Sequence, residues 1–132
     1  MRIMLDTNVL ISMILFQGKG FLQMLEYITQ NHSLVLSTFV VDELIEVTKR
    51  KFPSKRPVID YFLSNLSYEL VYTPASMPTN LFQIRDSHDY PVLYSAIINH
   101  IDIFITGDKD FQNIFIDHLK ILTPSEFIQK YL

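Results

Sequence analysis

Four acidic residues stand at the positions of this sequence that are best placed to do chemistry. Asp6 and Asp108 each follow a short, largely apolar run. Glu43 and Asp89 lie where two helices are expected to begin. Apolar runs of this length predict buried strands of an α/β sheet, and ligands collect beyond the carboxyl ends of such strands. Carboxylates that gather at one place repel one another unless they share protons or bind cations. The pattern therefore predicts a divalent-metal site used for phosphate chemistry.

Each of these acids also has an ordinary structural explanation. Asp6 and Asp89 can cap helices. Asp108 can shape a turn, and Glu43 can be an exposed helix acid, although apolar residues four positions away on either side place it at the edge of the buried face. Four acids in one consistent topology favour the metal site, because four negative charges match two divalent cations. Oxygen ligands favour Mg²⁺ or Mn²⁺ over zinc.

Several polar residues beside these acids are further candidates. Asn8 offers an amide that can orient a carboxylate or a water molecule. Asp110 follows Asp108 by two residues on a turn, so both can contact one cation from the same side. Asp86 can cap a helix or pair with the arginine before it. The four histidines show no metal-ligand spacing, and only His88, next to a predicted site acid, is of interest.

A basic run follows the helix that carries Glu43. It places five cations within eight residues, and these are Lys49, Arg50, Lys51, Lys55 and Arg56. The whole chain carries a formal charge of −3, so the remainder carries −8. One explanation is a solvated helix end that the helix dipole favours. The other is a clamp that holds the phosphate backbone of a nucleic acid beside the metal site.

Composition limits the class of protein. A length of 132 residues and an apolar fraction of 48% predict one globular domain, residues 1–132, with an ample core. There is no cysteine, which excludes disulfides, zinc–thiolate sites and thiol nucleophiles, and suits a reducing cytosol. The apolar stretch Val9–Phe16 is too short to span a bilayer and lacks a cleavage site, so we expect a buried helix. The protein is expected to be soluble and cytoplasmic, without a membrane partner.

Alternating strands and helices must position these residues. Strands are expected at 2–5, 34–36, 69–72, 102–105 and 119–122. Helices are expected from Asp6 to about 14, from the break at Gly18 and Gly20 to about 30, and at 38–50, 58–66, 89–99 and 124–131. Pro53 and Pro57 mark a loop, as does 74–78. This alternation predicts an α/β fold with a parallel sheet.

Four segments, in order along the chain, resemble a known family. Residues 4–10 (MLDTNVL) resemble the opening motif of PIN-domain ribonucleases, and residues 42–44 (DEL) resemble their helical glutamate motif. Residues 85–93 (RDSHDYPVL) and 105–111 (ITGDKDF) resemble the third and fourth motifs. The similarity is greatest to PIN toxins of bacterial toxin–antitoxin pairs, the VapC-like group.

The resemblance implies a PIN-like, doubly wound parallel sheet of about five strands flanked by helices. It also implies an Mg²⁺- or Mn²⁺-dependent endoribonuclease that hydrolyses RNA phosphodiester bonds at a two-metal carboxylate site. Such a toxin would act in the cytoplasm as a homodimer and be silenced by a small antitoxin. The implied ligands are Asp6, Glu43, Asp89 and Asp108. Asp110 is implied as an auxiliary acid, with Asn8 and Thr106 as supports.

Two other interpretations fit less of the sequence. A haloacid-dehalogenase-type phosphatase also has an aspartate after its first strand, but it needs a second one two residues later, where this chain has Asn8. A catalytically silent PIN-like scaffold would bind RNA or a protein partner without cutting. Such a scaffold is expected to have lost some acids, whereas this chain keeps all four.

Overall fold

Five short segments of the chain form one sheet in which every strand is parallel to its neighbours. The computed structural model describes residues 1–132. Its strands are β1 (Arg2–Leu5), β2 (Ser33–Ser37), β3 (Glu69–Val71), β4 (Ile103–Ile105) and β5 (Lys120–Leu122). Their order across the sheet is β3-β2-β1-β4-β5. This confirms the predicted α/β fold with a parallel sheet of five strands.

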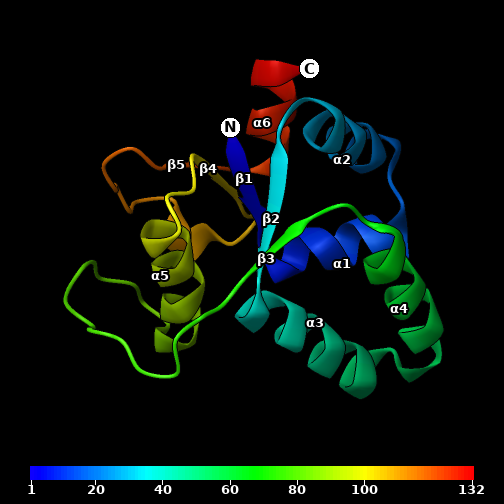
Figure 1. Ribbon diagram of the computed structural model, residues 1–132, viewed down its shortest axis with the longest axis horizontal. Coiled ribbons are helices and arrows are strands. Elements are labelled where there is room, and N and C mark those ends of the chain that lie inside the picture. Colours follow the sequence, from blue (N-terminus) through cyan, green and yellow to red (C-terminus); the bar gives the residue numbers. More distant parts are fainter.

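Six helices connect and cover these strands. They are α1 (Thr7–Phe16), α2 (Lys19–Asn31), α3 (Thr38–Lys51), α4 (Arg56–Asn65), α5 (Tyr90–Ile98) and α6 (Pro124–Tyr131). Figure 1 shows α5 on one side of the sheet and α1 and α4 on the other, with α2 beside α6. Single 3₁₀ turns occur at Pro53–Lys55, Ser87–Asp89 and Lys109–Phe111. The helices on both faces make the sheet doubly wound.

Some helix boundaries differ from those predicted from the sequence. The chain breaks between α1 and α2 at Gln17, which has a left-handed φ of 33°, and at Gly18, whereas Gly20 lies within the first turn of α2. Pro57 also lies in a first turn, that of α4, and not in a loop. A proline is tolerated there because the N–H that it lacks has no acceptor within the helix.

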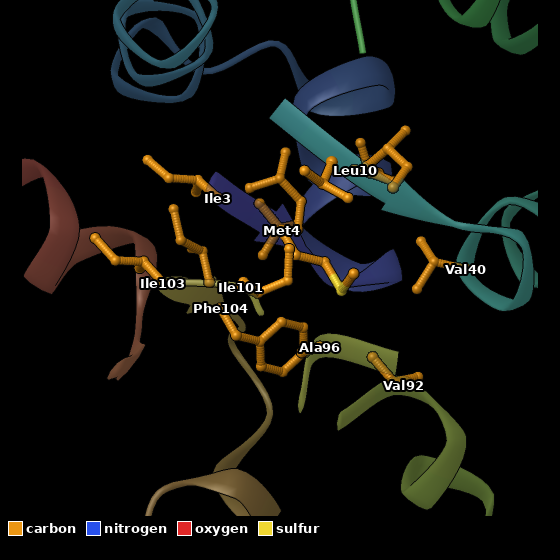
Figure 2. Close-up of a cluster of buried hydrophobic side chains, with 14 of the residues drawn as sticks. Ile3, Met4, Leu10, Val40, Val92, Ala96, Ile101, Ile103 and Phe104 are labelled. Carbon is orange, nitrogen blue, oxygen red and sulfur yellow. The ribbon is translucent and has the colours of Figure 1, made fainter. Parts of the chain in front are cut away.

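The core lies where β1 and β4 pack against the helices on either face. Met4 and Phe104 are fully buried and paired in register, and Figure 2 shows their side chains among those of Leu10 and Ala96. The next pair in register is Leu5 with Ile105. The two strands therefore end at the same level, so the residues that follow them leave the sheet side by side.

The apolar stretch Val9–Phe16 forms most of α1, and four of its side chains are buried, as predicted for a core helix. No single helix is long and apolar enough to cross a membrane. Only α1 and α2 taken together meet that criterion, and they are bent by 119° relative to each other.

Candidate metal centre

The first two site residues meet where β1 and β4 end. Asp6 follows β1, and its backbone N–H donates to the carbonyl of Ile105, the last residue of β4, at 3.0 Å. Thr106 follows β4, and its hydroxyl donates to Asp6 Oδ2 at 2.7 Å. Thr106 is buried, so this bond is shielded from water. The bond holds the carboxylate of Asp6 in place, and the resemblance implied Thr106 as a support of this kind.

Asp6 is held in an environment that disfavours its charge. Its side chain is buried, and its Oδ1 accepts a hydrogen bond from the Thr7 N–H at 2.8 Å. Burial raises the pKa of Asp6 to about 6, although the bonds from Thr106 and Thr7 oppose the rise. The charges of Glu43 and Asp108 raise this pKa further. A cation bound beside Asp6 would relieve both the burial and the repulsion.

Three further carboxylates lie together at this edge of the sheet. One oxygen from each of Asp89, Asp108 and Asp110 lies within 4.8 Å of the others. Asp108 is fixed on both sides, because its N–H donates to Thr106 Oγ1 at 3.1 Å and its Oδ1 accepts from the Asp110 N–H at 2.9 Å. These three acids form the tightest acidic group of the site, and we call them the acid cluster. The cluster contains Asp110, which the turn after Asp108 predicted beside the same cation and for which the resemblance implied an auxiliary role.

Asp89 does not cap α5, although it immediately precedes that helix. Its carboxylate caps no N–H and makes no other hydrogen bond. The alternative that capping explains Asp89 is therefore wrong. Burial raises the pKa of Asp89 to about 7, and the charges of Asp108 and Asp86 add to the rise. A partly buried carboxylate among other acids, without a donor of its own, is typical of a metal ligand.

Glu43 lies on α3 and is held by two side chains. Its Oε1 accepts from the Thr7 hydroxyl at 2.5 Å, and its Oε2 is 2.8 Å from His88 Nε2. The hydrogen bond to Glu43 raises the pKa of His88 above its usual value, so the pair favours a protonated imidazole. Glu43 is half-buried while Asp42 and Glu46 are exposed, as predicted. Glu43 is not part of the acid cluster, but its charge acts on Asp6.

The sequence did not identify the contact between Arg85 and Asp110, and it left two alternatives open for Asp86. The Arg85 guanidinium donates to both oxygens of Asp110, through Nε at 2.9 Å and Nη2 at 3.1 Å. Asp86 does not pair with Arg85 but accepts from the His88 N–H at 3.0 Å, which confirms the capping alternative. Asn8 is exposed and makes no hydrogen bond, so the predicted support from its amide is not seen in this structure.

The basic run is largely exposed and lies at the end of α3 and the start of α4. Lys49, Arg50 and Lys51 end α3. Lys55 and Arg56 follow, at the junction of the 3₁₀ turn with α4. Arg50 lines a pocket of about 210 Å³ together with Glu43 and His88. Arg50 is therefore the residue of the basic run that reaches the site.

The donor set fits a hard divalent cation. Every candidate ligand is a carboxylate oxygen, and the acid cluster lies beside the buried Asp6. Mg²⁺ and Mn²⁺ prefer such ligands, whereas zinc sites favour histidine and cysteine. The raised pKa values of Asp6 and Asp89 report the repulsion that a cation would remove.

Replacing Thr106 by valine is expected to destabilise the protein by about 1–3 kcal/mol, because valine leaves Asp6 Oδ2 without its donor and the Asp108 N–H without its acceptor. Urea unfolding of Thr106→Val in EDTA measures the loss. Thr106→Ser keeps the hydroxyl and is the matched control. Equal unfolding free energies for the two variants would show that the hydroxyl does not support Asp6.

Comparisons with known proteins bear on the fold and the family. The family model of the PIN domain matches residues 2–110. No curated protein matches the sequence. A chain of VapBC2 from Rickettsia felis, in a complex with a DNA fragment from the promoter, is similar at a TM-score of 0.69 and 20% identity, covering 92% of this chain and 97% of that one. A chain of VapBC-1 from nontypeable Haemophilus influenzae is similar at a TM-score of 0.66 and 19% identity, covering 95% and 99%. At these identities the two structures show a shared fold.

Proposed function

Because this chain belongs to the PIN-domain family, we propose that it is an endoribonuclease that hydrolyses RNA phosphodiester bonds with one or two bound Mg²⁺ or Mn²⁺ ions. The observation that carries this proposal is the acid cluster at the carboxyl edge of the sheet, with the buried Asp6 beside it. A site that gathers this many carboxylates, of which Asp6, Asp89 and Asp108 form no ion pair, would repel RNA unless cations were bound there. Metal-assisted phosphodiester chemistry is therefore the activity that the geometry supports best.

Different side chains would bind the cations and orient their ligands. Asp6, Asp89 and Asp108 would hold the cations, with Glu43 as the fourth ligand and Asp110 as an auxiliary acid. When bound, such cations lower the pKa of a coordinated water and neutralise charge at the reacting phosphate. None of the carboxylates needs to act as a nucleophile. Thr7 and Thr106 would orient Glu43 and Asp6, since each already donates a hydrogen bond to its acid.

Incubation of the protein with a mixed RNA pool in Mn²⁺, Mg²⁺ or EDTA tests the proposal. Cutting in either metal that stops in EDTA is the expected result. Calorimetry with Mn²⁺ alone separates the alternatives if no RNA is cut. Metal binding without cutting would contradict a ribonuclease of broad specificity. Only a ribonuclease with a narrow substrate range would then remain. Neither binding nor cutting would support a silent PIN-like scaffold.

The basic run is proposed to hold the RNA backbone. Lys49, Lys51 and Lys55 form no ion pair, whereas Arg50 and Arg56 face Glu46 and Asp60 at 3.8 Å and 2.9 Å. Replacing the three lysines together by alanine is expected to weaken RNA binding regardless of sequence. The slope of log K against log salt is expected to fall by about 0.7 for each phosphate that the variant no longer neutralises.

Fluorescence anisotropy with single-stranded RNA at several salt concentrations measures this slope. The triple variant Lys19→Ala, Lys120→Ala, Lys130→Ala is the control, because it removes the same charge from other elements. An equal loss of affinity in both variants would show that only net charge matters and that the basic run has no special role.

We also propose that the chain is the toxin of a toxin–antitoxin pair, acting in the cytoplasm as a homodimer that a small antitoxin silences. Two of the similar solved structures are of VapBC, which supports an antitoxin partner. An apolar groove of about 280 Å³ between α1, α2 and α4 also supports it, with Leu22, Val58 and Tyr61 exposed there. Co-expression with the product of a neighbouring small reading frame, followed by size-exclusion chromatography, tests the pairing and the oligomeric state.

A further inference from the structure

The pocket that Glu43, His88 and Arg50 line lies between the candidate metal centre and the basic run. It has a volume of about 210 Å³, and Glu43 and His88 form its end nearest the acids while Arg50 forms the other end. The remaining lining residues are Phe39, Asp42, Glu46 and Val47, all on α3, and we call this space the α3 pocket. An RNA strand that reaches from the acids to the basic run must pass over it.

Two aromatic rings, those of Phe39 and His88, line the α3 pocket. The Phe39 and His88 rings lie 5.4 Å apart between centroids and are inclined at 56° to each other. His88 is exposed over 64% of its side chain, yet its ring is fixed by the 2.8 Å contact with Glu43. Fixed and accessible rings of this kind are the surfaces on which unpaired bases stack in complexes with RNA.

The rim of the pocket carries acceptors that have no donor. Asp42 is exposed, and its carboxylate makes no hydrogen bond. Glu46 has only Arg50 near it, at 3.8 Å, which is longer than a hydrogen bond. Asp42 and Glu46 both have carboxylates that accept no hydrogen bond, although Glu46 has Arg50 beside it, and their negative charge disfavours a phosphate group at this position. They favour a neutral group that presents N–H donors.

We propose that the α3 pocket binds one unpaired nucleobase of the RNA strand and prefers guanine. Guanine has N–H donors at both N1 and N2 on one edge, and a carboxylate can accept both, whereas the other bases offer fewer donors to the same acceptor. A pocket of this volume admits a single base and excludes a base pair. The inference rests on the proposed function, because it assigns the pocket to the same RNA strand that the acids would cut.

Binding in EDTA tests this inference apart from cleavage. The probes are fluorescently labelled single-stranded hexamers of uridine that contain one guanosine, one inosine or no other base. Inosine lacks only the N2 amino group of guanine. We expect the wild-type protein to bind the guanosine hexamer about tenfold more tightly than either of the others.

Two variants and a control assign the preference to the α3 pocket. The double variant Asp42→Asn, Glu46→Gln is expected to reduce the guanosine-to-inosine ratio to about one. The control Glu26→Gln, Asp117→Asn makes the same charge change at exposed acids elsewhere and is expected to keep the ratio. Phe39→Leu is expected to weaken binding of all hexamers at least about fivefold while the ratio stays unchanged.

The possible outcomes distinguish base binding in the α3 pocket from nuclease activity. A ratio near one for the wild-type protein, or a ratio that survives in the double variant, overturns the base preference even if the protein cuts RNA. A tenfold ratio that the double variant loses supports the pocket even if no RNA is cut, in which case the proposed nuclease activity fails alone.

Discussion

Replacing Asp6 by asparagine is expected to reduce RNA cleavage by more than about 100-fold while the fold stays intact. Loss of a residue that merely supports a metal ligand already costs about 10–100-fold, and Asp6 is proposed to be a ligand itself. Asparagine keeps an Oδ1 that can accept from the Thr7 N–H, and its amide can donate to the Thr106 hydroxyl. The substitution also removes a charge that burial disfavours, so the variant should be at least as stable as the wild type in EDTA at pH 7.5.

Cleavage of the mixed RNA pool in Mn²⁺ and thermal unfolding in EDTA are measured together on the wild type, Asp6→Asn and Asp108→Asn. The control is Asp117→Asn, which makes the same change at an exposed acid away from the site. It should cut like the wild type. Wild-type cleavage by both site variants in a clean preparation would refute the assignment of these acids. A large fall in unfolding temperature would show instead that Asp6 has a structural role.

The sequence predicts the elements that carry the site because their signals are local. The apolar runs before Asp6 and Asp108 predict β1 and β4 as buried strands, and the structure shows that these two strands are parallel neighbours. Pro91 fixes the beginning of α5 and hence the place of Asp89. Where the prediction failed, the local signal was ambiguous. Pro57 fits a loop as well as the first turn of a helix, and only the packing of α4 decides between them.

The side-chain pairs within the site could not be predicted in the same way. His88 meets Glu43 across 45 residues of sequence, and Arg85 meets Asp110 across 25. Both Arg85 and His88 follow the long segment after β3, which has no periodicity that would fix its path. Thr7 is a different case. It stands between Asp6 and Asn8, which are both candidate site residues. The sequence does not show which of these three polar side chains contacts Glu43.

Without divalent cations, the protein is expected to lose stability as the pH rises from about 4 to 8. The pKa of Asp6, about 6, and that of Asp89, about 7, both lie above the ordinary value of 3.8 because of burial. Between pH 3.8 and these raised pKa values, the folded state binds more protons than the unfolded state. The free energy of unfolding therefore falls as the pH rises. The raised pKa of His88, caused by its bond to Glu43, acts in the same direction, weakly because the ring is exposed. Asp6 alone accounts for a loss on the order of 3 kcal/mol over this range.

Mn²⁺ or Mg²⁺ is expected to reverse this loss at pH 8 and to do little at pH 5, where protons compete for the same oxygens. A cation at 100 times its dissociation constant adds about 2.7 kcal/mol, which raises the unfolding temperature by about 10 °C in a domain of this size. Thermal unfolding at both pH values, with EDTA or with metal at matched ionic strength, measures the effect. Asp89→Asn should flatten the pH dependence in EDTA and reduce the gain from metal, whereas Asp117→Asn should change neither. Because proton release and cation binding use the same carboxylates, an equal metal effect at both pH values, or one that persists in Asp89→Asn, would place the cation away from the acid cluster.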